Sequence, residues 1–249
     1  MRLLILSDIH ANATALDTSL DACEGRWQRV LCLGDIVGYG PDPNEVVDRI
    51  RALGALTIRG NHDKAIAGLD SAEDFNPIAR HAAVWSREQL SPENREYLQN
   101  LPVGPLTVEG MTFVHGSLHD EDEYVFTAAQ ALQGLLDAST PVTFFGHTHL
   151  QGGFALRENG DQVETVHPRL IAGTDFARFS IEPNVNYLLN PGAIGQPRDG
   201  DPRAGFCIAD PENKALEFWR VAYDVGGVQD RMRSAGLPEA LILRLAFGR

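Results

Sequence analysis

Five short apolar segments of this sequence end abruptly in polar residues of the same few kinds. The segment Val30–Leu33 is followed by Gly34-Asp35, and Leu3–Ser7 is followed by Asp8-Ile9-His10. Three more segments end in the same way, at Gly60-Asn61-His62-Asp63, at His115 and at Gly146-His147-Thr148-His149. A short continuous apolar run is typical of a strand that is buried on both faces. Since open α/β sheets bind ligands beyond the carboxyl ends of their strands, these endings predict one shared site.

Helical patterns separate the first three of these segments. Asn12 can cap a helix that runs to about Glu24. Asp42-Pro43 supplies an N-cap and a first-turn proline for a helix that runs to Leu53. The order strand, helix, strand, helix, strand predicts right-handed crossovers and a parallel sheet.

The middle of the chain predicts further helices, and the remainder mostly predicts strands. Lys64 to about Asn100 has a helical pattern that is broken at Asp74–Pro77 and at Ser91-Pro92, where a proline can start each new helix. Another helix is expected at about Ala128–Ala138, and two short ones from about Val228 and Pro238. A turn at Glu158–Gly160 and further strands are also expected, the strands at Leu106–Val108, Thr112–Val114, Gly153–Arg157, Val163–Val166, Val185–Leu189, Phe206–Ala209 and Leu216–Val221.

The chain shows no internal repeat, no low-complexity tract and no linker long enough to separate two domains. We therefore predict a single domain over residues 1–249. Its fold class is α/β (α+β in some schemes), as a four-layer α/β/β/α sandwich in which two mixed β-sheets are flanked by helices.

The chain is strongly acidic, with 21 basic and 34 acidic residues and a formal net charge of −13. Duplex nucleic acid is therefore an improbable partner, because a groove for it needs a basic surface. A small anionic substrate is compatible with this charge, because bound metal cations would reverse its sign locally.

The cysteines and the amino terminus favour a cytoplasmic protein. Cys23, Cys32 and Cys207 are odd in number and widely spaced, which favours three buried thiols over a disulfide framework or a zinc ribbon. The first apolar run is stopped at Asp8 after about five residues, too few for a signal peptide or a membrane span.

The polar residues at the five endings are metal-ligand types. His10 follows Asp8 by two residues, and His147 and His149 have the same spacing, so each pair lies on one face of an extended segment. A lone histidine is usually structural, but here five of the eight histidines lie in such loops. Mixed nitrogen and oxygen donors suit Mn²⁺, Fe²⁺, Zn²⁺ or Ni²⁺ better than Ca²⁺.

Taken in order, the five endings resemble those of the calcineurin-like metallophosphoesterase superfamily. The size of the chain and the segment Asn190-Pro191-Gly192-Ala193 resemble the compact single-domain bacterial and archaeal branch, which is YfcE-like. The resemblance implies two divalent metal ions, one held by Asp8, His10, Asp35 and His149, and the other by Asp35, Asn61, His115 and His147. It also implies that His62 protonates the leaving group and that its neighbour Asp63 orients the site.

The expected function is that of a metal-dependent phosphatase. A hydroxide that bridges the two ions would attack the phosphate ester directly, on a small phosphorylated substrate such as a nucleotide. A phosphodiesterase or a dinucleoside-polyphosphate hydrolase is the alternative among enzymes, and a phosphoprotein phosphatase is a further one. A non-catalytic metal-binding scaffold is the alternative from another class, although scaffolds should have degraded ligand sets.

Several other residues have two interpretations each. Asn12 could bind a phosphate oxygen or only cap a helix, and Arg198 could clamp phosphate or form a surface ion pair. Tyr39 could stack on a base or simply pack. Substrate choice is assigned to Gly38–Pro43, Lys64–Asn100, Ser117–Tyr124 and Arg169–Pro183, which carry no recognisable motif. The substrate, the native metal pair and the oligomeric state stay open.

Overall fold

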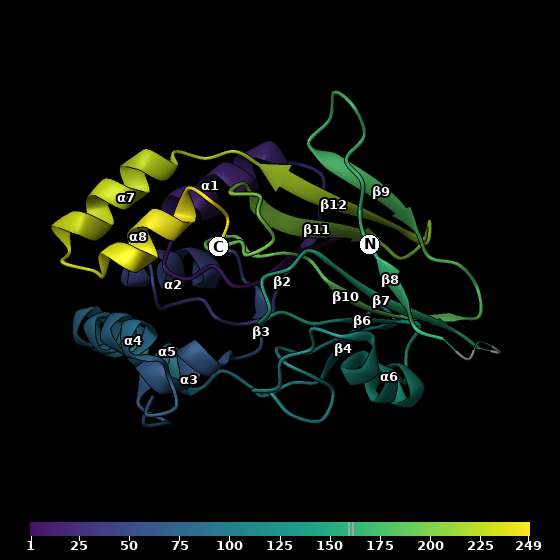
Figure 1. Ribbon diagram of the computed structural model, residues 1–249, viewed down its shortest axis with the longest axis horizontal. Helices are drawn as coiled ribbons and strands as arrows, with labels where there is room; N and C mark the ends of the chain where they lie inside the picture. Colours follow the sequence, from purple (N-terminus) through teal and green to yellow (C-terminus); the bar gives the residue numbers. More distant parts are fainter. Residues whose placement is uncertain (159, 161) are drawn as a thin grey trace.

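A computed structural model describes residues 1–158, 160 and 162–249. Its strands form two six-stranded mixed sheets that pack face to face, with helices on both outer faces (Figure 1). The predicted α/β/β/α sandwich is therefore confirmed. That these layers form a single domain remains a prediction.

Sheet A has the strand order β3-β2-β1-β11-β12-β9. Its first three strands are parallel, as the alternation of strands and helices predicted, and the others are antiparallel to their neighbours. The strands are β1 (Leu3–Leu6), β2 (Arg29–Cys32), β3 (Leu56–Thr57), β9 (Phe176–Ser180), β11 (Ala204–Asp210) and β12 (Ala215–Val221).

Sheet B has the order β4-β5-β6-β10-β7-β8. Its central strands β5, β6 and β10 are parallel, and each of the outer strands β4, β7 and β8 is antiparallel to the strand or strands beside it. The strands are β4 (Leu106–Val108), β5 (Met111–Phe113), β6 (Val142–Phe144), β7 (Gly152–Arg157), β8 (Glu164–Val166) and β10 (Val185–Asn190).

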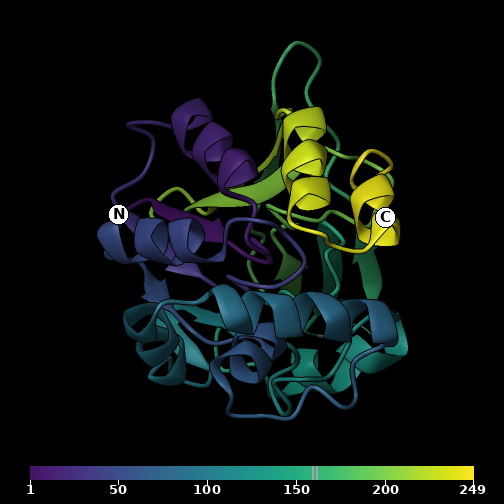
Figure 2. The ribbon, with the colours of Figure 1, turned by 90° about the vertical axis from the view of Figure 1, so that its left-hand side faces the viewer.

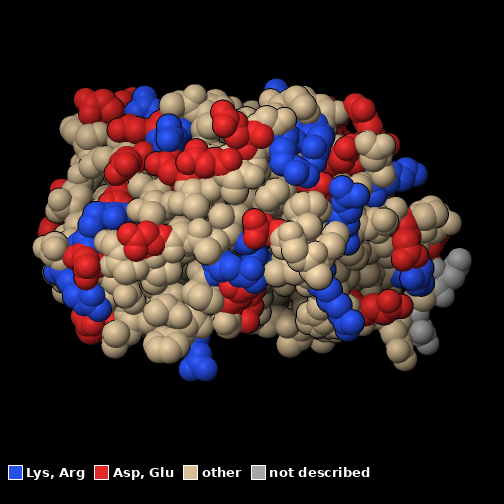
Figure 3. All heavy atoms as spheres, turned by 90° about the horizontal axis from the view of Figure 1, so that it is seen from above, with Lys and Arg blue, Asp and Glu red and all other residues tan. Residues whose placement is uncertain are grey.

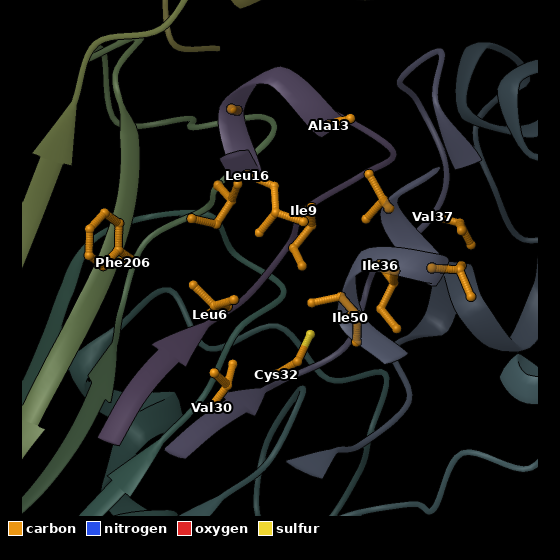
Figure 4. Close-up of a cluster of buried hydrophobic side chains, with 14 of the residues drawn as sticks. Leu6, Ile9, Ala13, Leu16, Val30, Cys32, Ile36, Val37, Ile50 and Phe206 are labelled. Atoms are coloured by element: carbon orange, nitrogen blue, oxygen red, sulfur yellow. The ribbon is translucent and has the colours of Figure 1, made fainter. Parts of the chain in front are cut away.

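Alternate side chains of each central strand enter different cores. Leu3 and Ile5 of β1 face sheet B and join the core between the sheets, whereas Leu4 and Leu6 face the helices. Figure 4 shows Leu6, Leu16 and Ile50 pointing into this helix-facing core. Strands that are buried on both faces have no polar side to alternate with, which explains the continuous apolar runs in the sequence.

Helices cover both sheets. Helices α1 (Ala13–Ala22) and α2 (Pro43–Ala52) pack on sheet A, and α6 (Ala128–Asp137) packs on sheet B. The helices α3 (Asn61–Ala67), α4 (Pro77–Gln89) and α5 (Pro92–Gln99) form the predicted helical insert. The C-terminal helices α7 (Val225–Ser234) and α8 (Glu239–Leu245) pack against α4 and Tyr39, and Figure 2 shows them in yellow above α4.

The structure corrects the starts of three helices and adds one strand. Helix α3 begins at Asn61 instead of Lys64, and the last two helices begin at Val225 and Glu239. Strand β9 lies within the segment Arg169–Pro183, which was assigned to substrate choice. It is an edge strand that buries little of its surface, so its sequence carries a weak pattern, and pairing with β12 creates it. The turn predicted at Glu158–Gly160 includes residue 159, which lies outside the described residues.

All three cysteines are free and buried, as predicted. Among the helices of the described residues, none is both long and apolar enough to cross a membrane.

Candidate metal centre

The endings of β1, β2 and β3 from sheet A meet those of β5 and β6 from sheet B. Two groups of donor side chains result, and within each group one donor atom per residue lies within 4.8 Å of all the others. The first group is Asp8, His10, Asp35 and His149, and the second is Asp35, His115 and His147. Asp35 is common to both, so the structure brings together the residues that the resemblance assigned to two ions.

In the first group, imidazole nitrogens face carboxylate oxygens and each other. His10 Nε2 lies 3.1 Å from His149 Nε2 and 3.6 Å from Asp35 Oδ2. His149 Nε2 lies 3.3 Å from Asp8 Oδ1. All four side chains are buried. Four potential ligand atoms therefore converge in a space closed to bulk water.

In the second group, imidazole nitrogens again lie close to side-chain oxygens. His115 Nε2 lies 3.6 Å from Asp35 Oδ2 and 3.4 Å from Asn61 Oδ1. The rings of His115 and His147 have centroids 5.0 Å apart. Asn61 therefore contributes its amide oxygen at the place where the resemblance put it.

The hydrogen bonds of the imidazoles show that this donor set fits a cation. His10 Nδ1 and His149 Nδ1 each donate to a backbone carbonyl, of Val37 (3.1 Å) and Gln196 (2.6 Å). Their Nε2 atoms therefore carry lone pairs in the neutral rings, and these lone pairs point at each other. His115 Nδ1 likewise donates to Leu33 O (2.7 Å), which leaves its Nε2 facing two oxygens. Converging acceptors repel one another unless a positive charge lies between them.

The pKa values agree with this arrangement. Burial, which disfavours charged imidazole, lowers the pKa of His147 to about 3 and that of His10 well below its usual value. Burial opposes a charge on His115 too, but the carboxylate of Asp35 prevails and raises its pKa to about 9. Without a metal, a proton on His115 therefore compensates the buried carboxylate, and a metal ion would replace it.

The backbone at the strand endings is strained at the ligand positions. Asp8, His10, Asp35, His147 and His149 all have φ between 48° and 65°, the left-handed region that residues other than glycine rarely adopt. Such conformations cost roughly 1–3 kcal/mol each and cluster at functional sites. This backbone conformation occurs at residues of both donor groups.

Two glycines let the endings of β2 and β3 approach each other. A Cβ atom at Gly60 would lie 2.1 Å from Asp35 Oδ1, and one at Gly34 would lie 2.4 Å from the backbone nitrogen of Gly60. The glycines that precede Asp35 and Asn61 are therefore required by this close approach.

Asp63 holds the loop that follows β2. Its Oδ1 accepts hydrogen bonds from the backbone N–H groups of Ile36 (2.9 Å) and Val37 (3.2 Å), and its Oδ2 accepts one from Gly60 (3.0 Å). Burial and the charge of Asp35 raise its pKa to about 7, although the backbone donors oppose this. These contacts support the orienting role that the resemblance assigned to Asp63.

His62 lies beside the donor groups in a ring of aromatic side chains. Its Nε2 is 3.1 Å from the hydroxyl of Tyr39, while its Nδ1 is buried without a hydrogen-bond partner among the described residues. The rings of Tyr39 and Phe75 each lie 4.5 Å from its ring. Burial lowers the pKa of His62 to about 4, and the nearby guanidinium of Arg198 adds to this shift.

The two predicted substrate contacts differ in outcome. Asn12 caps α1, since its Oδ1 accepts from Ala15 N (3.0 Å), and its Nδ2 donates to Gly195 O (3.1 Å). Both ends of this side chain are used within the fold, which favours the cap over the phosphate contact. The Arg198 guanidinium instead lies near His62 and donates to the hydroxyl of Tyr39 at 3.4 Å. Among the described residues it has no carboxylate partner, which disfavours the surface ion pair.

A cavity of about 270 Å³ opens beside the second donor group. Its walls include Tyr39, Phe75 and Tyr124, together with the acidic side chains Asp70, Asp74 and Asp122. Tyr124 stacks on His147 with ring centroids 3.7 Å apart. The sequence singled out neither Phe75 nor Tyr124, which lie within the segments Lys64–Asn100 and Ser117–Tyr124 that were assigned as a whole to substrate choice. An aromatic residue shortly before a helix or in an acidic loop gives little local signal.

Comparison with known proteins identifies the family. The model of the calcineurin-like phosphoesterase superfamily domain matches residues 1–214. A protein of Methanocaldococcus jannaschii, MJ0912, is 32% identical over 98% of this chain and 97% of its own length. The chain therefore belongs to the calcineurin-like phosphoesterase superfamily, as the resemblance predicted. The finer placement in a YfcE-like branch still depends on the sequence resemblance.

Two solved structures are similar to this protein over its full length. The metallophosphoesterase from Sphaerobacter thermophilus is 40% identical and superposes with a TM-score of 0.85, over 100% of this chain and 99% of its own. The protein PH1004 from Pyrococcus horikoshii is 22% identical, with a TM-score of 0.80 over 100% of this chain and 98% of its own, and it agrees in fold.

Proposed function

We propose that this protein is a metal-dependent phosphatase that hydrolyses a small phosphate ester at a two-metal site. One observation carries the proposal: two groups of buried donors share Asp35, and their donor atoms converge at a place that a cation would stabilise. The donor set of imidazoles, carboxylates and one amide suits Mn, Fe, Zn or Ni. The reaction proposed is direct attack of hydroxide on phosphorus, without a covalent enzyme intermediate.

Each side chain of the site would have a separate role in the reaction. Bound divalent ions would supply positive charge that polarises the phosphoryl oxygens and lowers the pKa of the attacking water. Asp8, Asp35, the Asn61 amide and the four imidazoles would hold those ions. Asp63 would fix the β2 loop and the start of α3. His62 would donate a proton to the departing oxygen.

Because its pKa is low, His62 can donate a proton to the leaving group only if it is first protonated. A neutral imidazole has no second proton to give, so His62 must take one up as the substrate binds. A phosphate dianion brings the negative charge that raises the pKa of a neighbouring imidazole. The unbonded Nδ1 offers a position for this proton.

A phosphodiesterase or a dinucleoside-polyphosphate hydrolase is the second candidate. It is favoured by the cavity beside His62, where Tyr39, Phe75 and Tyr124 could hold an aromatic leaving group such as a nucleobase. The non-catalytic scaffold is disfavoured, because each of the seven residues assigned as ligands is present and lies at the centre.

A small phosphorylated substrate, such as a nucleotide, is the partner that we propose. Acidic and basic side chains are interspersed on the face in Figure 3, without the broad basic surface that duplex nucleic acid would need. The cytoplasmic location and the absence of a membrane partner remain predictions, and the oligomeric state remains open.

The test is hydrolysis by metal-stripped protein to which Mn²⁺, Zn²⁺, Fe²⁺, Ni²⁺ and Mg²⁺ are added back singly. The substrates are p-nitrophenyl phosphate and bis-p-nitrophenyl phosphate, whose ratio separates the phosphatase from the phosphodiesterase. Asp35→Ala should abolish turnover, and Asp48→Ala, an exposed acid on α2, should not affect it. Metal bound in calorimetry without turnover of either ester would favour the scaffold.

A further inference from the structure

Two arginines from distant parts of the chain meet at Tyr39, beside the candidate centre. Arg198 follows β10, and Arg244 lies on α8, which Figure 1 shows at the same end of the molecule as α2 and α4. Their guanidinium carbons lie 5.8 Å and 5.1 Å from the centroid of the Tyr39 ring. The Nη2 atoms of both arginines donate to the same oxygen, Oε1 of Gln196. The two positive charges are therefore neighbours.

Among the described residues, no acidic side chain pairs with these charges. Within the described ranges, neither Arg198 nor Arg244 lies within 4.0 Å of a carboxylate oxygen, whereas Arg231 and Arg233 of the adjacent helix α7 both form ion pairs. The Nε atoms of Arg198 and Arg244 are buried and lack a hydrogen-bond partner there as well. Burial, and then the charge of Arg198, lower the pKa of Arg244. These two guanidinium groups thus lie together without a neighbouring carboxylate in the described part of the chain, although the chain has 34 acidic residues.

The pair lies one side chain away from the proposed reaction. The hydroxyl of Tyr39 is 3.1 Å from His62 Nε2 and 3.4 Å from Arg198 Nη2, so it links the two. The backbone N–H of Arg198 also donates to the carbonyl of His149 at 3.2 Å. Arg244 contacts Gln196 and Tyr39, one layer behind the donor groups.

The cavity on the other side of His62 is acidic. The cavity beside His62 is lined by Asp70, Asp74 and Asp122, and its Lys64 is paired with Asp70, Glu121 and Asp122. A second anionic group of a substrate would be repelled there. Planar guanidinium groups bind phosphate oxygens in pairs of parallel hydrogen bonds, so Arg198 and Arg244 are suited to receive it.

We propose that Arg198 and Arg244 form a second anion site, which binds a phosphoryl group of the substrate other than the one that is hydrolysed. The substrate class is then a small molecule with two phosphoryl groups, one at the donor groups and one at the arginine pair. Arg244 would be a specificity-determining residue. As a statement about substrate, this inference rests on the proposed phosphoesterase function.

The experiment compares two anions that the enzyme cannot hydrolyse. Full-length protein loaded with Mn²⁺ and dialysed free of excess metal is titrated calorimetrically with inorganic phosphate and with methylenebisphosphonate, and the metal content is checked afterwards. Arg244→Gln should weaken the bisphosphonate at least about tenfold, the loss expected for a charged hydrogen bond. Inorganic phosphate, held by the donor groups, should change much less.

Three variants control this result. Arg233→Gln removes the same charge from α7, where Arg233 is paired with Asp230 and Glu239, and should bind both anions like the wild type. Arg198→Gln, on a separate loop, should reproduce the selective loss and so exclude a folding defect of α8. Arg244→Lys should restore only part of the affinity, because it keeps the charge and loses the planar fork.

The outcomes separate this inference from the proposed function. Equal losses for both anions, or no loss for the bisphosphonate, would overturn the second anion site even in an enzyme that hydrolyses p-nitrophenyl phosphate. Selective loss supports it, because binding is measured without turnover. A protein that binds selectively but hydrolyses no ester would contradict the phosphatase alone.

Discussion

Asp35 is the residue on which the candidate centre depends most. Its Oδ2 lies 3.6 Å from an imidazole nitrogen of each donor group, His10 and His115. Its Oδ1 accepts a hydrogen bond from the backbone N–H of His62 at 2.9 Å, which fixes the start of α3. One carboxylate thus links both groups and the proposed proton donor.

Replacement of His62 should separate metal binding from chemistry. His62→Gln should leave the metal content unchanged, because the ring belongs to neither donor group, and should lower kcat about 10²–10⁴-fold, as for loss of a general acid. The loss should be greatest for esters with poor leaving groups. Metal analysis and a series of substituted phenyl phosphates test this, and an equal loss across the series would contradict proton donation by His62.

Metal binding should release a proton from His115. Its pKa of about 9 in the metal-free protein means that it is charged at neutral pH, and only the neutral ring can bind a metal. Apparent metal affinity should therefore rise with pH up to about 9 and then level off.

Calorimetric titration of Mn²⁺ at pH 7, in buffers of different ionisation enthalpy, should show release of about one proton. His115→Gln should release fewer protons than the wild type. Equal release from both proteins would show that the proton comes from another group.

At the scale of elements, the site is built where strands end and turns begin. The β2 ending and the first turn of α3 touch through Gly34 and Gly60, and Asp63 joins them by three backbone hydrogen bonds. Helix α3 therefore begins at Asn61, inside the motif, and its first residues are site residues. This contact positions Asn61, His62 and Asp35 relative to one another.

A methyl group at Gly60 should damage the centre more than the fold. In Gly60→Ala the new Cβ would overlap Asp35 Oδ1, which must move, so metal affinity should fall at least about tenfold, the loss expected when a group that holds a ligand is disturbed. Gly134→Ala on α6 is the control, because its Cβ would lie an ordinary 3.8 Å from Leu188. Metal titration measures both, and unchanged affinity in Gly60→Ala would contradict the close approach.

At the scale of the whole molecule, neither sheet supplies a complete donor group. Sheet A supplies Asp8, His10, Asp35 and Asn61, and sheet B supplies His115, His147 and His149. Each donor group combines residues of both sheets. The centre therefore exists only when the two sheets are packed, and metal binding is linked to the folding of the entire sandwich.

Bound metal should therefore stabilise the protein. At a metal concentration of about 100 times Kd, the free energy of unfolding should rise by about 2.7 kcal/mol. For a chain of this length, that corresponds to a rise in Tm of roughly 5–10 °C. Differential scanning calorimetry with Mn²⁺ and then with excess chelator tests this; a Tm that does not respond to the chelator would mean that the sheets pack without help from metal.

Much of this architecture could be predicted from the sequence. The apolar runs such as Leu3–Leu6 predicted buried parallel strands, because both faces of a central strand must be covered. The prolines at 77 and 92 predicted the starts of α4 and α5, because proline fits the first helical turn. The edge strand β9 escaped prediction, because pairing with β12 and not local pattern creates it.

The sequence by itself determined the donor types, their order and their place at the strand ends, because these are local properties of a few residues each. Only the tertiary structure decided that Asn12 serves as a cap and that Arg244 joins Arg198 at Tyr39. Arg244 follows Arg198 by almost fifty residues and has no motif around it. Such contacts arise from the packing of distant elements, which no local pattern of residues encodes.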